Sequence, residues 1–511
     1  MKPFDADGSF HSLTETDGLR RRAVRGAGVT VLSQSGGFLV QMIATVILAR
    51  LLGPADFGLL AIVTTFSLLL MNVGLNGLTE AVLQREHMDH ALASNLFWIN
   101  AALGLVLATA FVGLGPLLAR FYGEPRVTAV AAALALTIII TSLSVQHLAL
   151  LKRAMHFSRV SANDIVARAV SVTVSIVLAL LGWGYWSLVA GTVALPLSTT
   201  IGAWLLCRWI PGRPRPAPGT GAMVRFALHT YARFVMGYCT ENLDKFLIGW
   251  CFGAAPLGLY RKAYDLFVMP SNQLSSPLTA VAVSALSRLA GEERRRRRHL
   301  LEALSTMAFV GMGLGAALTL VGRDLIGVLL GPGWDEAGRL FTLMGPGIGV
   351  MLLYGTHGWI HLSIGRPDRW IRWGVVELAV MSTLFLLGLQ WGPAGIAVAW
   401  TLSYWILTMP GLWYAGQGQL GLGALMDVVW RNVVASAAAA GVTVAIVSTL
   451  PWMARTPAVV GSVGRILATS AVFGALYLAA VIVLHRGYAP LAHLAGLVRI
   501  MTMPTPARDL A

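Results

Sequence analysis

The chain has 511 residues, of which 56% are apolar and only 12% are charged. Soluble domains carry roughly 25% charged residues, so the composition excludes a water-exposed surface of ordinary polarity. The 38 Lys and Arg residues outnumber the 23 Asp and Glu residues, which gives a net charge of +15. So apolar a composition indicates a polytopic membrane protein, and the excess of positive charge has to be explained by where its basic residues lie relative to the membrane.

The first segment, 1–26, is polar and ends in the basic stretch RRRAVR. The apolar run that follows is longer than the core of a signal peptide and shows no clear small-residue cleavage site. We therefore expect 1–26 to be a basic cytoplasmic tail and the apolar run to remain as the first membrane span.

Apolar stretches of about 20 residues, long enough to cross a bilayer as helices, recur along the chain. Strands with the alternating polarity of an outer-membrane barrel are not apparent in the sequence. The pattern predicts an all-α polytopic membrane protein with about 14 transmembrane helices. The predicted spans are 27–50, 58–83, 94–119, 127–151, 163–182, 185–208, 224–252, 263–287, 300–322, 339–364, 371–389, 393–415, 428–450 and 462–485.

Metal and disulfide chemistry find little support. The three cysteines, Cys207, Cys239 and Cys251, lie in apolar spans without zinc-type spacing or a disulfide framework. His357 and His361 are spaced i,i+4, but no glutamate of the zinc-protease type lies between them. Hydrogen bonding between helices is the favoured interpretation, and we predict no metal and no cofactor other than a coupling H⁺ or Na⁺.

The basic residues predict the orientation. Placing the N-terminus in the cytoplasm puts most Lys and Arg residues in cytoplasmic loops, as the positive-inside rule requires. The sharpest cluster, Arg294–Arg298 in the loop GEERRRRRH, is interpreted as a topology anchor that contacts anionic lipid headgroups. A nucleic-acid or partner site is the alternative, although stacking aromatic residues are missing. The C-terminal tail, 486–511, is also predicted to be cytoplasmic.

An internal repeat relates 51–60, LLGPADFGLL, to 251–260, CFGAAPLGLY, with identical residues at four positions. Six spans precede the first span of the second copy, so both copies have the same orientation, which is a transporter architecture. We predict two pseudo-symmetric six-helix lobes and two additional C-terminal helices. The predicted boundaries are 27–208 for the N-lobe, 209–223 for a Pro-rich cytoplasmic linker, 224–416 for the C-lobe and 417–485 for the last two helices.

The repeats with their flanks, ILARLLGPADFGLLAIV (47–63) and DKFLIGWCFGAAPLGLYRKAYDL (244–266), resemble the signatures of bacterial polysaccharide repeat-unit flippases. These flippases are part of the multidrug/oligosaccharidyl-lipid/polysaccharide exporter superfamily, and the resemblance covers about residues 20–485. It implies a protein of the bacterial inner membrane that moves undecaprenyl-diphosphate-linked oligosaccharides to the outer leaflet. The implied products are exopolysaccharide, capsule or the O-antigen of lipopolysaccharide. A polysaccharide polymerase and chain-length or export machinery are the implied protein partners.

Ionisable residues within the seventh span are the main candidates for a site, because a charge there costs about 3 kcal/mol and normally faces a cavity or partner. Glu241 and Lys245 are spaced i,i+4 and can pair. Arg233 returns to nearly the same face as Asp244, and Asn242 adds to this polar column. We interpret the column as lining the cavity between the lobes, with cations attracting a diphosphate and Glu241 or Asp244 carrying H⁺ or Na⁺. A Glu–Lys pair that only fixes packing is the alternative.

Four further residues are secondary candidates for the cavity. Asn76 and Glu80 lie on one stripe of the second span, where cavity lining and snorkelling of Glu80 both remain open. Arg168 lies four residues after Asp164, so an intrahelical ion pair is favoured. Asp265 lies at the external start of the predicted eighth span.

Other functions compete with a flippase working by alternating access. One is a membrane enzyme, such as a polymerase or transferase acting on the same lipid-linked sugars. The predicted external segments carry no convincing acid–base constellation, so we do not expect an enzyme. The others are a peptidoglycan-precursor flippase and a drug/cation antiporter of the same superfamily.

Overall fold

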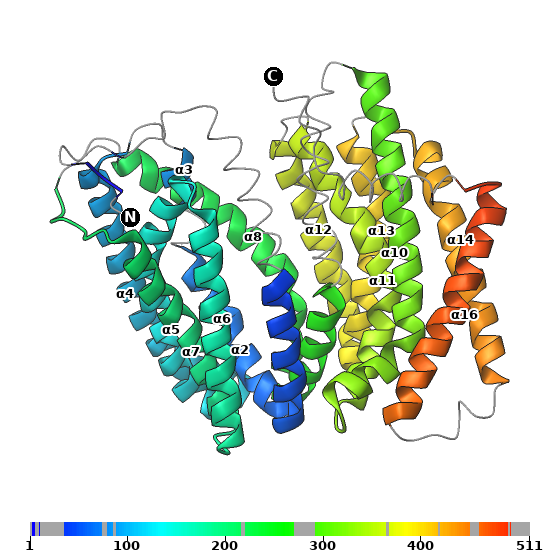
Figure 1. Ribbon diagram of the computed structural model, residues 1–511, viewed down its shortest axis with the longest axis horizontal. Coiled ribbons are helices and arrows are strands. Elements are labelled where there is room, and N and C mark those ends of the chain that lie inside the picture. Colours follow the sequence, from blue (N-terminus) through cyan, green and yellow to red (C-terminus); the bar gives the residue numbers. More distant parts are fainter. Residues whose placement is uncertain are drawn as a thin grey trace. The chain divides into compact units, whose positions relative to one another are not determined.

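The computed structural model describes residues 3–5, 10, 35–73, 79–84, 88–215, 220–269, 292–363, 367–416, 420–449, 459–488 and 491. Regular structure in these residues is helical apart from isolated bridges (Figure 1). The chain forms two compact units. Unit 1 holds Met1–Arg261 and Leu330–Gly333, and unit 2 holds Lys262–Leu329 and Trp334–Ala511.

In unit 1, α4 packs on α5, α6 on α7, α5 on α7, and α8 on α2. A first helix, Ser35–Leu51, precedes them. The others are α2 (Pro54–Val73), α3 (Thr79–Gln84), α4 (His90–Tyr122), α5 (Arg126–Arg153), α6 (Phe157–Leu180), α7 (Tyr185–Cys207) and α8 (Thr220–Phe252).

In unit 2, α11 packs on α13, α12 on α13, and α14 on α16. Figure 1 shows α14 and α16 side by side at one edge of the unit. A helix over 254–269 runs from unit 1 into unit 2. The others are α10 (Glu293–Leu330), α11 (Asp335–Ser363), α12 (Pro367–Gly388), the 3₁₀ turn η2 (Leu389–Trp391), α13 (Gly392–Ala415), α14 (Leu422–Ser448) and α16 (Val459–His485).

The packing order agrees with an internal repeat. The pairs α5–α7 and α6–α7 in unit 1 have their counterparts in α11–α13 and α12–α13 in unit 2. Each counterpart is the helix that occupies the same place after its copy of the repeat. These two helix contacts are therefore common to both units.

The helices confirm a multi-pass membrane protein. Ten helical segments among the described residues are long and apolar enough to cross a membrane, and one of them, Arg369–Ala415, covers most of α12 and all of α13. Large apolar side chains such as Leu205, Leu387 and Val483 are exposed on these helices. A water-soluble surface rarely exposes large apolar side chains along so many long helices, whereas a lipid-facing surface does.

The predicted loop around Arg294–Arg298 was wrong, because these residues form the first turns of α10. Ion pairs one helical turn apart, Arg295–Glu292 (3.0 Å) and Arg298–Glu302 (2.9 Å), support a helix there. The 38 residues of α10 extend over about 57 Å at 1.5 Å per residue. The hydrocarbon core is only about 30 Å thick, so α10 reaches well beyond it.

The eighth predicted span also begins in a different place, at residue 254 rather than 263. Gly253 has a φ of +83°, a conformation that glycine adopts without steric cost. The chain therefore turns from α8 into the next helix within one residue. As a result Asp265 lies inside this helix and not at its start, and residues 270–287 of the predicted span lie outside the described part of the chain.

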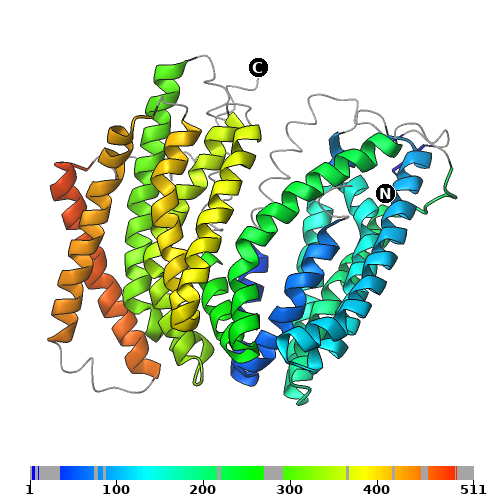
Figure 2. The ribbon, with the colours of Figure 1, turned by 180° about the vertical axis from the view of Figure 1, so that it is seen from behind.

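Helix α8 groups with unit 1, although the sequence suggested that it opens the second lobe. The Tyr231 hydroxyl donates to the carbonyl of Leu69 (2.9 Å), and the Tyr238 hydroxyl donates to that of Thr65 (2.7 Å). Figure 2 shows α8 as the long green helix that crosses unit 1. The lobe boundary at 209–223 stays a prediction. Helix α8 lies after that boundary in the sequence but packs in unit 1.

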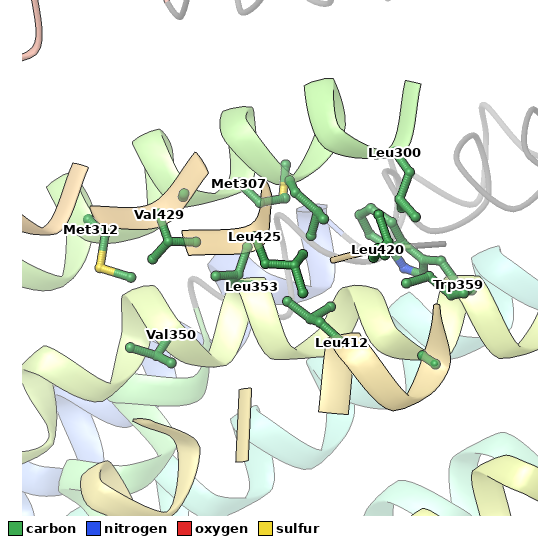
Figure 3. Close-up of a cluster of buried hydrophobic side chains, with 14 residues drawn as sticks. Leu300, Met307, Met312, Val350, Leu353, Trp359, Leu412, Leu420, Leu425 and Val429 are labelled. Atoms are coloured by element: carbon green, nitrogen blue, oxygen red, sulfur yellow. The ribbon is translucent and has the colours of Figure 1, made fainter. Parts of the chain in front are cut away.

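Unit 2 has a buried apolar cluster contributed by α10, α11, α13 and α14 (Figure 3). Leu304, Leu353 and Leu412 are almost fully buried there, and each contributes about 1.5–3 kcal/mol by leaving solvent. Helix α16 is joined to α10 by an ion pair in which Arg465 donates to Asp324 (2.5 Å).

The first part of the predicted linker is held against α4. The amide of Gly212 donates to Ser94 Oγ (2.9 Å), and the Trp98 indole donates to the Gly212 carbonyl (2.8 Å). Asn95 pairs with both backbone groups of Arg215, whose amide donates to Asn95 Oδ1 (2.9 Å). Side chains within five consecutive residues of α4 thus anchor the first part of the linker.

Removing these anchors should free the linker. Ser94→Ala and Asn95→Ala are expected to raise the hydrogen-exchange rates of the Gly212 and Arg215 amides about three- to tenfold, since a hydrogen bond contributes roughly 0.5–1.5 kcal/mol. Exchange measured by mass spectrometry checks this. Thr109→Ala is the control, because the Thr109 hydroxyl bonds only its own helix, at Leu105 (2.9 Å). Unchanged exchange in both linker variants would contradict the anchoring role.

Candidate functional site

Two charged residues of the polar column on α8 are buried in unit 1. Asp244 is 1% exposed and Lys245 is 3% exposed. The Lys245 ammonium lies 3.2 Å from Asp244 Oδ1 and donates to the carbonyl of Glu241 (2.6 Å). The Tyr260 hydroxyl donates to Asp244 Oδ2 (2.7 Å). Both charges are therefore neutralised inside the packed helices.

This burial divides the predicted column into two kinds of position. Removing one partner of a buried, hydrogen-bonded ion pair strongly destabilises a folded protein. Asp244 and Lys245 therefore stabilise the packing of α8, whether or not they also take part in transport. Glu241 is exposed, and Asn242 is half-buried with its amide donating to the Tyr238 carbonyl (2.9 Å). Arg233 lies on α8, but its side chain is outside the described part of the structure. Of the two acids in the column, Glu241 is the one whose side chain is exposed.

Three tyrosines of this region were not singled out from the sequence. Tyr260, in the helix after Gly253, completes the site around Asp244 from a second helix. Tyr231 and Tyr238 are spaced seven residues apart and attach two turns of α8 to α2. The sequence did offer a signal for Tyr231 and Tyr238. Two tyrosines seven residues apart lie on the same face of an apolar helix and could have been expected to bond one neighbouring helix.

The two copies of the repeat meet at their glycines. A Cβ on Gly58 would lie 1.7 Å from the Ala254 carbonyl oxygen, and a Cβ on Gly258 would lie 1.9 Å from the Pro54 carbonyl oxygen. The contact is reciprocal, since Gly58 and Gly258 correspond in the repeat, as do Pro54 and Ala254. Only glycine permits this distance, which explains why the identities between the copies include these positions.

The secondary candidates are distributed over the structure. The predicted ion pair between Arg168 and Asp164 is confirmed at 2.9 Å, on the exposed side of α6. Asp265 is exposed on the part of helix 254–269 that belongs to unit 2. Glu80 lies on the short helix α3, and neither its side chain nor Asn76 is among the described parts.

The histidine pair on α11 lies among aromatic side chains of unit 2. His357 Nδ1 donates to the carbonyl of Tyr354 (2.6 Å), which can only accept, so this nitrogen carries the proton. The Tyr354 hydroxyl accepts from the Trp373 indole on α12 (2.8 Å). The rings of His361 and Trp370 are stacked. The hydrogen bond of His357 stays within α11. Its contact with α12 is an aromatic one, with the ring of Trp370, and not the hydrogen bond between helices that the sequence suggested.

Residues 47–339 match the sequence profile of a family described as "Polysaccharide biosynthesis protein". The chain is 22% identical over 391 residues to the succinoglycan biosynthesis transport protein ExoT of Rhizobium meliloti, covering 76% of this chain and 79% of that protein. It is 22% identical over 414 residues to the lipopolysaccharide biosynthesis protein WzxC of Escherichia coli, covering 77% and 82%. It is 24% identical over 358 residues to the teichuronic acid biosynthesis protein TuaB of Bacillus subtilis, covering 67% and 73%.

Solved structures share the fold. The lipid II flippase MurJ, in an inward closed conformation, superposes with a TM-score of 0.71 at 13% identity, covering 89% of this chain and 98% of that chain. A multidrug resistance transporter of the MATE family, in an inward-facing conformation, gives a TM-score of 0.59 at 14% identity, covering 76% and 96%. At such low identity the likeness establishes the fold alone.

Proposed function

Because the chain belongs to the polysaccharide biosynthesis protein family, we propose that it is a flippase for undecaprenyl-diphosphate-linked oligosaccharide units. It moves them from the inner to the outer leaflet of the bacterial inner membrane for exopolysaccharide, capsule or O-antigen synthesis. The observation that carries this proposal is the family match over 47–339, which includes both copies of the repeat. The names of the relatives and the fold shared with a lipid flippase support it.

The proposed mechanism is alternating access. The sugar-diphosphate headgroup enters from the cytoplasm while the lipid tail stays in the bilayer. Arg233 is the proposed phosphate contact, because guanidinium forms forked hydrogen bonds with phosphate oxygens. Glu241 is the proposed carrier of H⁺ or Na⁺, since it is exposed whereas Asp244 is buried against Lys245. Both termini are cytoplasmic in this proposal, where the substrate-making enzymes and the polymerase or export partners meet the protein.

Deleting the protein in its host tests the function. We expect loss of surface polysaccharide, with intact lipid-linked units trapped on the cytoplasmic leaflet, and recovery with a plasmid copy. Extracted lipid-linked oligosaccharide, measured with and without a membrane-impermeant glycosidase, reports the leaflet. Units that are flipped but not polymerised would indicate a membrane enzyme. Unchanged pools in a strain without a second transporter would favour an antiporter.

A further inference from the structure

Two phenylalanines near the N-terminus, Phe4 and Phe10, dock at the end of unit 1 where α4 begins and α5 ends. An isolated antiparallel bridge joins their backbones, and their rings meet edge to face with centroids 5.7 Å apart. Both side chains are half-buried and pack against a buried apolar cluster of unit 1 that includes Leu96 and Leu150. Chain termini stay poorly ordered unless contacts tie them down, so this aromatic pair attaches the N-terminal segment to the folded unit.

The aromatic pair contacts three segments that are far apart in the sequence. The centroid of the Phe4 ring lies 5.4 Å from that of His90, the first residue of α4. It lies 6.2 Å from the ring of Trp209, at the start of the predicted linker. The guanidinium of Arg153, the last residue of α5, lies 5.2 Å from the centre of the Phe10 ring, within the range of a cation–π interaction. The pair therefore joins α4, α5 and the linker.

Trp209 is the linker residue through which this contact acts. Its side chain is 4% exposed, and its ring packs edge to face on Phe97 of α4, with centroids 6.1 Å apart. Its carbonyl accepts from His147 Nε2 on α5 (3.1 Å). Further along the linker, the amides of Gly212 and Arg215 donate to side chains of α4. Phe4 thus adds a contact from the N-terminal segment to a stretch of linker that α4 and α5 already hold.

The restrained linker leads directly into α8. Thr220, the first residue of α8, follows Arg215 by five positions, and five residues of extended chain span at most about 18 Å. The start of α8 therefore stays within that distance of the residues that α4 anchors. Glu241 and Asp244 lie further along the same helix, so a restraint on the linker acts on the helix that carries the candidate site.

We propose that the aromatic pair is a latch, which holds the linker on α4 and α5 and opposes movement of α8. Its effect on transport rests on the proposed function, because alternating access requires the polar column of α8 to open first to one side of the membrane and then to the other. Release breaks the contacts of two half-buried rings, Phe4 and Phe10, and leaves the hydrogen bonds within α4 and α5 intact. The latch can therefore open without unfolding of the helices that it joins.

Removing both rings tests the latch. Full-length protein with Phe4→Ala and Phe10→Ala, in nanodiscs, is compared with the wild type by hydrogen exchange read by mass spectrometry. Peptides that cover 209–215 are expected to exchange about tenfold faster, because the loss of aromatic contacts changes an opening equilibrium by that order. In the host, at equal protein levels, the initial rate of polysaccharide export is expected to rise at least about twofold, since the population shifts toward the released state.

Two control variants separate the latch from general effects of the changes. Phe4→Tyr with Phe10→Tyr keeps both rings and should exchange and export as the wild type does. Phe157→Ala removes another half-buried ring, at the first residue of α6, which makes no ring contact within the described part of the chain. It should leave exchange over 209–215 unchanged.

Either of two results would overturn the inference. Unchanged exchange over 209–215 in the alanine variant would show that the aromatic pair does not hold the linker. Faster exchange with unchanged or slower export would make the pair a support for the folded unit and not a latch that opposes transport. The exchange measurement does not depend on what is transported. A deletion strain without trapped lipid-linked units would therefore contradict the proposed function and leave the holding of the linker intact.

Discussion

The Asp244→Ala variant is expected to lose about 3–5 kcal/mol of stability, because it removes the carboxylate that neutralises a buried ammonium. Asp244 and Lys245 are 1% and 3% exposed and lie 3.2 Å apart. The change also removes the acceptor of the Tyr260 hydroxyl. We expect a lower thermal unfolding temperature for the purified protein and no export in a complementation assay.

A double variant separates structure from transport. Replacing a buried ion pair by apolar residues of similar volume is often neutral or stabilising, so Asp244→Leu with Lys245→Met should unfold near the wild-type temperature. If this variant is stable and does not export, the pair acts in transport. Restored export would make the pair purely structural and remove it from the site. Arg233→Ala, tested in parallel, is expected to stop export without a change in stability.

The second large effect is expected at the crossing of the repeats. Gly58→Ala places a methyl group only 1.7 Å from the present position of the Ala254 carbonyl oxygen. The first turns of α2 and of helix 254–269 therefore have to move apart. Overpacking of this kind costs roughly 1–3 kcal/mol. If the crossing forms once in every transport cycle, export should fall at least about tenfold, which corresponds to 1.4 kcal/mol. Gly258→Ala should behave alike, because the contact is reciprocal.

Gly237→Ala is the control for this prediction. Gly237 lies on α8 with no atom within 4 Å of the position that a Cβ would take. Alanine favours a helix by about 1 kcal/mol over glycine, so this variant should be as stable as the wild type or more so. Normal export from Gly58→Ala, at wild-type protein levels, would refute the idea that close approach at this point matters for transport.

The helices were predictable from the sequence because burial in lipid requires long apolar runs, and these runs are visible without neighbours. Their ends were less predictable. Arg294–Arg298 are charged, yet they continue α10, since helix formation outside the bilayer depends on local pairs such as Arg298–Glu302 and not on hydropathy. The early start of helix 254–269 depends on the backbone of Gly253, which hydropathy does not report.

The candidate site could be located from the sequence but not described. A charge in an apolar run is unusual in itself, so Asp244 and Lys245 were found. Tyr260, which donates to Asp244, is sixteen residues away and on another helix. Tyrosine is common in apolar runs, so the sequence alone does not mark Tyr260 as part of the site. The pairing of Lys245 with its immediate neighbour, in addition to the carbonyl of Glu241, depends on side-chain rotamers that i,i+4 spacing does not specify.

The reciprocal contact of Gly58 and Gly258 also bears on what a mutation in one copy of the repeat can do. In a symmetric homodimer, if residue i of one subunit touches residue j of its partner, then residue i of the partner touches residue j of the first subunit. Gly58 with Ala254 and Gly258 with Pro54 reproduce this rule within one polypeptide. A single-repeat homodimer would hold the same crossing on its two-fold axis, where one mutation changes both glycines at once. Within one polypeptide a mutation changes one glycine alone, so either position can disrupt the crossing by itself.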